Sequence, residues 1–137
     1  MKRFADRKTR ECQRSVFVLT YRRSRAIAGI HSAYLVASGV WPILHRRSFE
    51  AVTSPKNEFW LVRTVGGLAA VCGAVLGASV VRGRPSGEIQ LLAAAQALVF
   101  VTADMFAART QSRVYLGDVV LQAACVPAWF VRWTPAK

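Results

Sequence analysis

Four long apolar runs alternate with short polar segments along the chain. The runs cover residues 26–44, 61–81, 89–108 and 114–133, and few Lys, Arg, Asp or Glu residues interrupt them. As helices they would be about 28 to 32 Å long, close to the thickness of the hydrocarbon core of a bilayer. We therefore expect an all-α, membrane-embedded bundle of about four transmembrane helices over residues 26–133, after a basic tail at 1–25.

The polar segments between the runs predict where the helices end. Ser54 followed by Pro55 is typical of a helix start, so we expect the second helix to begin at Pro55. Residues 83–88 predict a turn. The segment 44–60 is polar and aromatic and would lie on the outer membrane surface. The run 114–133 is the weakest of the four, and a count of three spans would omit it.

The charges are concentrated outside the apolar runs. The net charge is +12, and nine of the 19 Lys and Arg residues precede Ala26. With the N-terminus inside, 13 of these residues lie on the inner side and six on the outer side. The positive-inside rule therefore predicts that both termini lie in the cytoplasm. The tail has three aromatic residues and no nucleic-acid-reading motif, so we expect it to meet anionic lipid rather than nucleic acid.

No cofactor or metal site is indicated by the residues that could ligate one. Cys12, Cys72 and Cys125 form no C-x-x-C pair and no metal-ligand spacing, and no disulfide is implied. His31 and His45 are fourteen residues apart on one predicted helix, about 21 Å by rise, so they cannot clamp one haem iron. Phosphate-binding glycine loops and catalytic triads have no matching pattern either.

Small residues recur every three or four positions within the runs, a pattern that lets helices pack closely in a membrane. The clearest case is Gly66, Gly73 and Gly77 in the second run, with Ala70 between them. The first and third runs carry shorter versions, at Gly29, Ala33 and Ala37 and at Ala93 and Ala97. We expect these faces to be helix contacts, and the alternative is a ligand groove lined by the same glycines.

Ionisable side chains inside membrane spans are functional candidates by default. In the predicted topology His45, Arg63, Asp104 and Asp118 collect at the outer end of the bundle. The first hypothesis is a structural cluster in which Arg63 pairs with one of the two acids and fixes the helix register. The alternative is a proton relay or a ligand-binding site at this end.

Two further polar residues lie deeper in the runs. Gln96 shares a helical face with Phe100 and Asp104, which should point into the bundle rather than into lipid. His31 lies near Tyr34 on the first helix. We expect His31 to be a buried, hydrogen-bonded core residue, and a ligand or proton-carrying role is the alternative.

The run from His31 to Gly66, HSAYLVASGVWPILHRRSFEAVTSPKNEFWLVRTVG, together with VYLGD at Val114 to Asp118, resembles small uncharacterised bacterial membrane proteins with four helices. The architecture is also similar to that of the DoxX-like proteins. The resemblance implies four spans in a bacterial cytoplasmic membrane. It implies no activity and transfers no catalytic residue.

We therefore expect a non-enzymatic accessory or structural membrane subunit, packed through its glycine faces. Its expected partners are the lipid bilayer and either another membrane protein or a second copy of the chain. The competing hypothesis is a small transporter or proton-coupled protein that uses Asp104, Asp118, Arg63 and His31. A lipid- or quinone-modifying enzyme is the third and weakest hypothesis.

Overall fold

The structure is a computed structural model that describes residues 2–55, 57–83, 85–131 and 133, with side chains described from Val18 onward. Within these residues the chain forms five helices and no strand. In chain order they are α1 (Lys2–Leu44), α2 (Arg46–Thr53), α3 (Phe59–Arg82), α4 (Gly87–Thr110) and α5 (Tyr115–Trp129).

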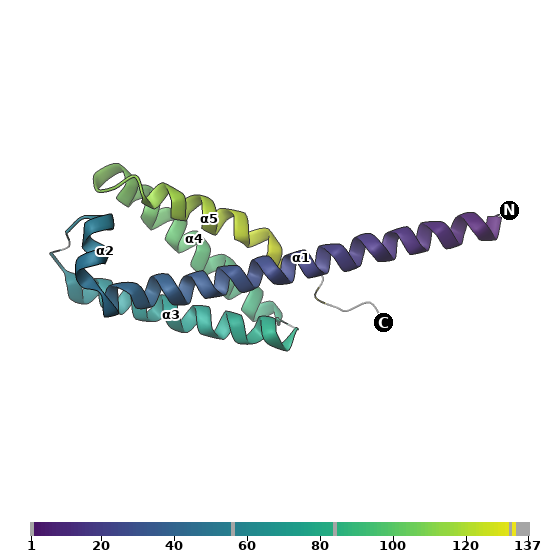
Figure 1. The fold of residues 1–137 in the computed structure, drawn as a ribbon, viewed down its shortest axis with the longest axis horizontal. Coiled ribbons are helices and arrows are strands. Elements are labelled where there is room, and N and C mark those ends of the chain that lie inside the picture. Colours follow the sequence, from purple (N-terminus) through teal and green to yellow (C-terminus); the bar gives the residue numbers. More distant parts are fainter. Residues whose placement is uncertain (1, 56, 84, 132, 134–137) are drawn as a thin grey trace.

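The helices are arranged as two pairs. Helix α1 runs antiparallel to α3 along a long contact, and α4 packs in the same way against α5 (Figure 1). The two pairs meet mainly where α5 crosses α1, whereas α3 and α4 barely touch. Helix α2 lies across the end of the bundle where α1 finishes, and the N-terminal part of α1 extends beyond the opposite end. The basic tail predicted at 1–25 is therefore continuous with the first span, from Lys2 onward.

Among the described residues, three helices are long and apolar enough to cross a membrane: Val18–Leu44 of α1, the whole of α3 and the whole of α4. Large apolar side chains such as Leu68, Leu98 and Phe106 are more than 60% exposed on the bundle surface, where lipid would cover them. Helix α5 has 15 residues, about 22 Å by rise, so its length alone does not establish a fourth span.

The segment between the first two spans differs from its prediction. Residues 46–53 form the short helix α2, and Ser54 follows it with a positive φ of 76°. Ser54 and Pro55 therefore end one helix, and α3 begins later, at Phe59 rather than at Pro55. The prediction was wrong because a residue that suits a helix start also suits a turn, where Ser and Pro are equally favoured.

Glycines allow α1 and α3 to approach backbone to backbone. A Cβ atom added to Gly66 would clash with the carbonyl group of Gly39, and one added to Gly73 would lie 2.8 Å from the Cβ atom of Leu35. A Cβ added to Gly77 would lie 3.5 Å from Ser32, an ordinary contact. Gly66 and Gly73 therefore lie inside the α1–α3 interface and Gly77 lies at its margin.

Candidate functional site: an acidic cavity beneath α2

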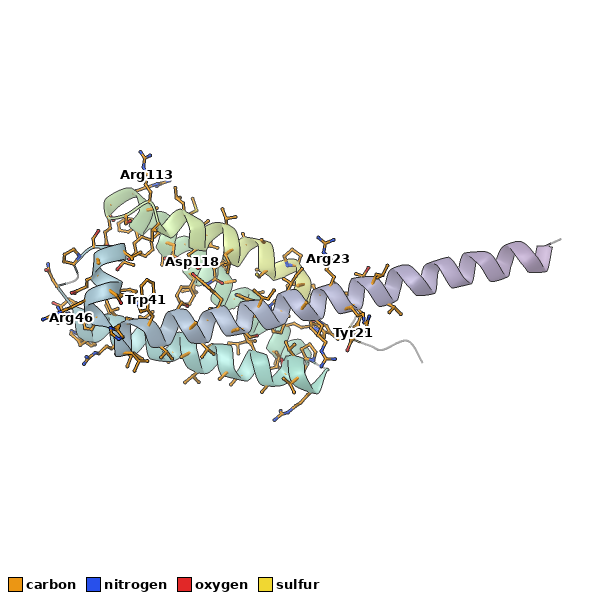
Figure 2. All side chains as sticks on the ribbon, viewed as in Figure 1. Tyr21, Arg23, Trp41, Arg46, Arg113 and Asp118 are labelled. Atoms are coloured by element: carbon orange, nitrogen blue, oxygen red, sulfur yellow. The ribbon has the colours of Figure 1, made fainter. Side chains whose placement is uncertain are left out.

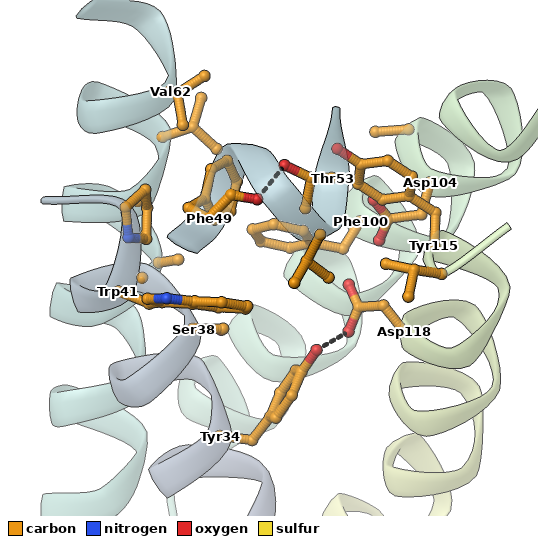
Figure 3. A pocket seen from close by; sticks show the side chains of 18 of the residues that line it. Tyr34, Ser38, Trp41, Phe49, Thr53, Val62, Phe100, Asp104, Tyr115 and Asp118 are labelled. Atoms are coloured by element: carbon orange, nitrogen blue, oxygen red, sulfur yellow. Dashed lines mark hydrogen bonds between the residues drawn. The ribbon is translucent and has the colours of Figure 1, made fainter. Parts of the chain in front are cut away.

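A cavity of about 580 Å³ lies at the α2 end of the bundle. All five helices contribute to its walls, including Tyr34 from α1, Phe49 from α2, Val65 from α3, Phe100 from α4 and Tyr115 from α5. The cavity occupies the space between the α1–α3 pair and the α4–α5 pair, and α2 closes it from one end (Figure 3). Its volume is within the range of pockets that hold small organic ligands.

Two carboxyl groups face each other in this cavity. Asp118, in the first turn of α5, accepts a hydrogen bond of 2.6 Å at Oδ1 from the Tyr34 hydroxyl (Figure 3). Asp104, near the end of α4, lies within hydrogen-bonding reach of the Asp118 carboxyl. The Asp104 side chain is only 7% exposed, and its Oδ2 atom has no hydrogen-bond partner among the described residues. One oxygen of this buried carboxyl is therefore left unsatisfied within the described part of the chain.

Helix geometry explains why the two acids meet. Phe100 and Asp104 are four residues apart, so they share one face of α4, and both line the cavity. A short turn over 111–114 reverses the chain into α5 and returns Asp118 to the level of Asp104. Figure 2 shows Asp118 pointing between the helices, whereas Arg113 in the turn points outward.

A second polar cluster lies one helical turn deeper, between α1 and α5. His31 is fully buried, its Nδ1 atom accepts a 3.1 Å hydrogen bond from the Trp129 indole, and its Nε2 atom lies 2.8 Å from Gln122 Oε1. An indole nitrogen can only donate, so Nδ1 carries no proton and Nε2 donates to Gln122. His31 is therefore held as a neutral imidazole of one tautomer. With Tyr34 and Asp118 next to it, this cluster forms a continuous polar strip along the α1–α5 contact.

Gln96 lies one turn deeper than Phe100 on α4 and is not among the cavity-lining residues. Both polar atoms of its carboxamide are buried without a partner among the described residues. The face of α4 that was predicted to point into the bundle thus carries two groups, Gln96 and Asp104, with unsatisfied hydrogen-bonding capacity.

The other two members of the predicted outer cluster lie elsewhere. His45 is exposed between α1 and α2, and Arg63 is exposed with its guanidinium 5.4 Å from the Phe59 ring centre. Neither lines the cavity, and within the described part of the chain Arg63 forms no ion pair with Asp104 or Asp118. A long arginine side chain near a span end can extend to the membrane surface, where water solvates its charge.

Sequence reasoning also missed several residues of the site. Gln122 follows Asp118 by four residues, and this spacing within an apolar run was a usable signal for a polar face on α5. The five aromatic residues that line the cavity come from four helices, and only the fold brings Trp41, Phe49 and Tyr115 together. No local pattern could have grouped them.

The chemistry of the cavity follows from its lining. No Lys, Arg or His side chain lines it, as far as the chain is described, so two carboxyl groups stand without a basic counterpart. The described residues also include no group of three or more His, Cys, Asp or Glu residues able to hold a metal ion. The arrangement suits a proton or a positively charged organic ligand.

Comparisons with family models, with curated proteins and with solved structures find no match to this chain.

Proposed function

We propose that this protein is a small proton-coupled carrier of a bacterial cytoplasmic membrane, with four spans, both termini in the cytoplasm and the acidic cavity at the outer end. The observation that carries the proposal is the unpartnered Oδ2 atom of Asp104, buried in a cavity of ligand size beside a second carboxyl group. Two negative charges repel strongly in apolar surroundings, so the pair favours taking up a proton or a cation. Ionisable groups placed in this way typically mark proton and substrate pathways.

The four-span count is supported by where α5 begins and ends. Next to its start, Ser112 donates a hydrogen bond to the Val52 carbonyl of α2, so the chain enters α5 at the cavity end. Beyond its end, the Trp133 ring lies 6.0 Å from the ring of Tyr21, near the other end of the α1 span. Ser112 and Trp133 therefore lie near opposite ends of the bundle, although the regular helix stops at Trp129.

The accessory-subunit hypothesis relied on the glycine faces. Gly66 and Gly73 pack against α1 of the same chain, so they leave no glycine surface there for a partner. The cavity, by contrast, is lined by Asp104, whose Oδ2 atom nothing in the described chain satisfies. The carrier hypothesis therefore accounts for a feature that the accessory hypothesis leaves without a role.

Proton uptake by liposomes tests the proposal. The purified chain is reconstituted with a pH-sensitive dye inside, and a potassium diffusion potential, negative inside, drives protons inward. We expect uptake above that of empty liposomes, abolished in Asp104→Asn and in Asp118→Asn. Glu88→Gln, which removes an exposed acid in the first turn of α4, is the matched control and should behave as the wild type. Equal uptake in Asp104→Asn and wild type would refute the proposal.

The topology has its own test. A fluorescent protein that matures only in the cytoplasm, fused to the C-terminus, should fluoresce if there are four spans. With three spans the C-terminus would be outside, and an alkaline phosphatase fusion would be active instead. The N-terminal fusion serves as the reference for the cytoplasmic side.

A further inference from the structure

The charged groups that line the cavity restrict the sign of the charge that a bound ligand can carry. The Tyr34 hydroxyl donates to Asp118 Oδ1, which leaves Asp104 Oδ2 as the acceptor without a donor. No basic side chain lines the cavity in the part of the chain that the structure describes. An occupant that complements the carboxyl pair must therefore bring positive charge or a hydrogen-bond donor, and an anion would be repelled.

The remaining walls restrict the kind of cation. Five aromatic residues surround the acid pair: Tyr34, Trp41, Phe49, Phe100 and Tyr115 (Figure 3). Aromatic faces attract cations, and they do so most effectively for organic ammonium groups that carry little water. The other lining residues are mostly apolar, Pro42 and Leu121 among them. These walls suit apolar substituents placed around a single positive charge.

A bare metal ion fits the same cavity poorly. Calcium takes six to eight oxygen ligands, and magnesium demands a near-ideal octahedron. The described lining offers two carboxyl groups and a few hydroxyl groups spread around about 580 Å³. An ion of that kind would keep most of its water in contact with apolar walls. The volume and the polarity both favour a larger, less hydrated cation.

We infer that the cavity binds a hydrophobic organic monocation of the quaternary ammonium or phosphonium class, with its charge beside the Asp104–Asp118 carboxyl pair and its apolar groups against the aromatic rings. This inference rests on the proposed function and narrows it, because it names the ligand class of the same cavity. A proton at the acid pair and the cation then compete for one site, which is the condition for exchanging one for the other.

Two ions of the same shape and opposite charge test the inference. Tetraphenylphosphonium and tetraphenylborate are each titrated into the purified full-length protein in mild detergent, with protein-free micelles as the blank. We expect saturable binding of tetraphenylphosphonium and only micelle partitioning of tetraphenylborate. Asp104→Asn should weaken cation binding about 30-fold or more, because it removes one partner of a buried charge pair. Glu88→Gln should bind as the wild type does.

A second pair of variants tests the aromatic wall without removing a charge. Phe100→Leu replaces a ring that lines the cavity, and Phe106→Leu replaces a ring of the same helix that is 70% exposed on the outer surface. We expect weaker cation binding, about three- to tenfold, in Phe100→Leu alone. This comparison decides the question even if Asp104→Asn does not fold.

The results separate the inference from the proposed function. Proton uptake without saturable tetraphenylphosphonium binding would overturn the ligand class and leave the carrier proposal intact. Equal binding of the two ions, or equal binding in wild type and Asp104→Asn, would also overturn the inference. Saturable cation binding that does not change with pH would support the cation site and refute proton coupling, because the proton and the cation would then not compete.

Discussion

Replacing Gly73 with alanine tests the close packing of α1 on α3. The added Cβ atom would lie 2.8 Å from the Leu35 Cβ atom and from the Ser32 carbonyl oxygen, and 2.9 Å from the Val36 nitrogen. These obstacles are backbone atoms or the first side-chain atom, so no rotamer change can remove them. Contacts between carbon atoms are optimal at about 3.5 to 4.0 Å. The two helices would therefore have to separate by roughly 0.7 Å or more at this point.

The change in stability caused by Gly73→Ala is the cost of overpacking the helix contact minus the gain from the higher helix propensity of alanine. Overpacking a tight contact costs about 1 to 3 kcal/mol, and a clash with backbone atoms belongs in the upper part of that range. Alanine recovers up to about 1 kcal/mol over glycine in a helix interior. We expect a net destabilisation of about 2 kcal/mol for Gly73→Ala. Separation of the helices would also loosen the packing of Leu35 and Leu76, which are almost completely buried.

Two glycines of the same helix provide matched controls. A Cβ added to Gly67 would meet no atom within 4 Å, and one added to Gly77 would make an ordinary contact at 3.5 Å. Thermal unfolding in mild detergent, followed as loss of the monodisperse peak of a fluorescent fusion, should rank the variants. We expect a midpoint several degrees lower in Gly73→Ala, a wild-type midpoint or above in Gly67→Ala, and Gly77→Ala close to wild type. If Gly73→Ala is as stable as Gly67→Ala, the α1–α3 packing argument fails.

Three further variants probe the polar strip between α1 and α5. His31→Phe leaves the Trp129 indole and the Gln122 carbonyl without partners, so we expect about 1 to 3 kcal/mol lower stability in the same unfolding assay. His31→Gln, which can donate and accept, should lose less, and equal losses would contradict the assigned hydrogen bonds. Tyr34→Phe removes the donor to Asp118, and we expect slower proton uptake at unchanged protein yield. Wild-type uptake in Tyr34→Phe would exclude that hydroxyl from the pathway.

The long apolar helices could be predicted from sequence because apolarity over about 20 residues is a strong signal. The runs 61–81 and 89–108 became Phe59–Arg82 and Gly87–Thr110, each extended by one or two residues at its ends. Helix α2 carried no comparable signal, since eight residues cannot define a span and the polar–aromatic pattern suited a surface loop equally well. Its position over the cavity depends on tertiary contacts.

The candidate site could be predicted in part. Chain topology alone places Asp104 and Asp118 at one end of the bundle, because the turn between their helices is short. The position of Arg63 could not be predicted in the same way. Its side chain is long enough to reach either the acids or the membrane surface, and hydration of the charge decides between them. The hydrophobic periodicity of a sequence also cannot predict a cavity, because the residues that line a cavity are far apart in the chain.

The way the helix pairs meet links the cavity to the packing of the whole bundle. Helices α3 and α4 barely touch, so the α1–α3 and α4–α5 pairs are joined mainly along α1 and α5. Two hydrogen bonds cross this α1–α5 contact, one from Tyr34 to Asp118 and one from His31 to Gln122. A charge that arrives at Asp104 acts on the carboxyl pair that anchors the first of these bonds. Occupancy of the cavity and the association of the two helix pairs are therefore thermodynamically linked. A ligand that strengthens or weakens the Tyr34–Asp118 hydrogen bond changes the free energy of association of the two pairs by the same amount.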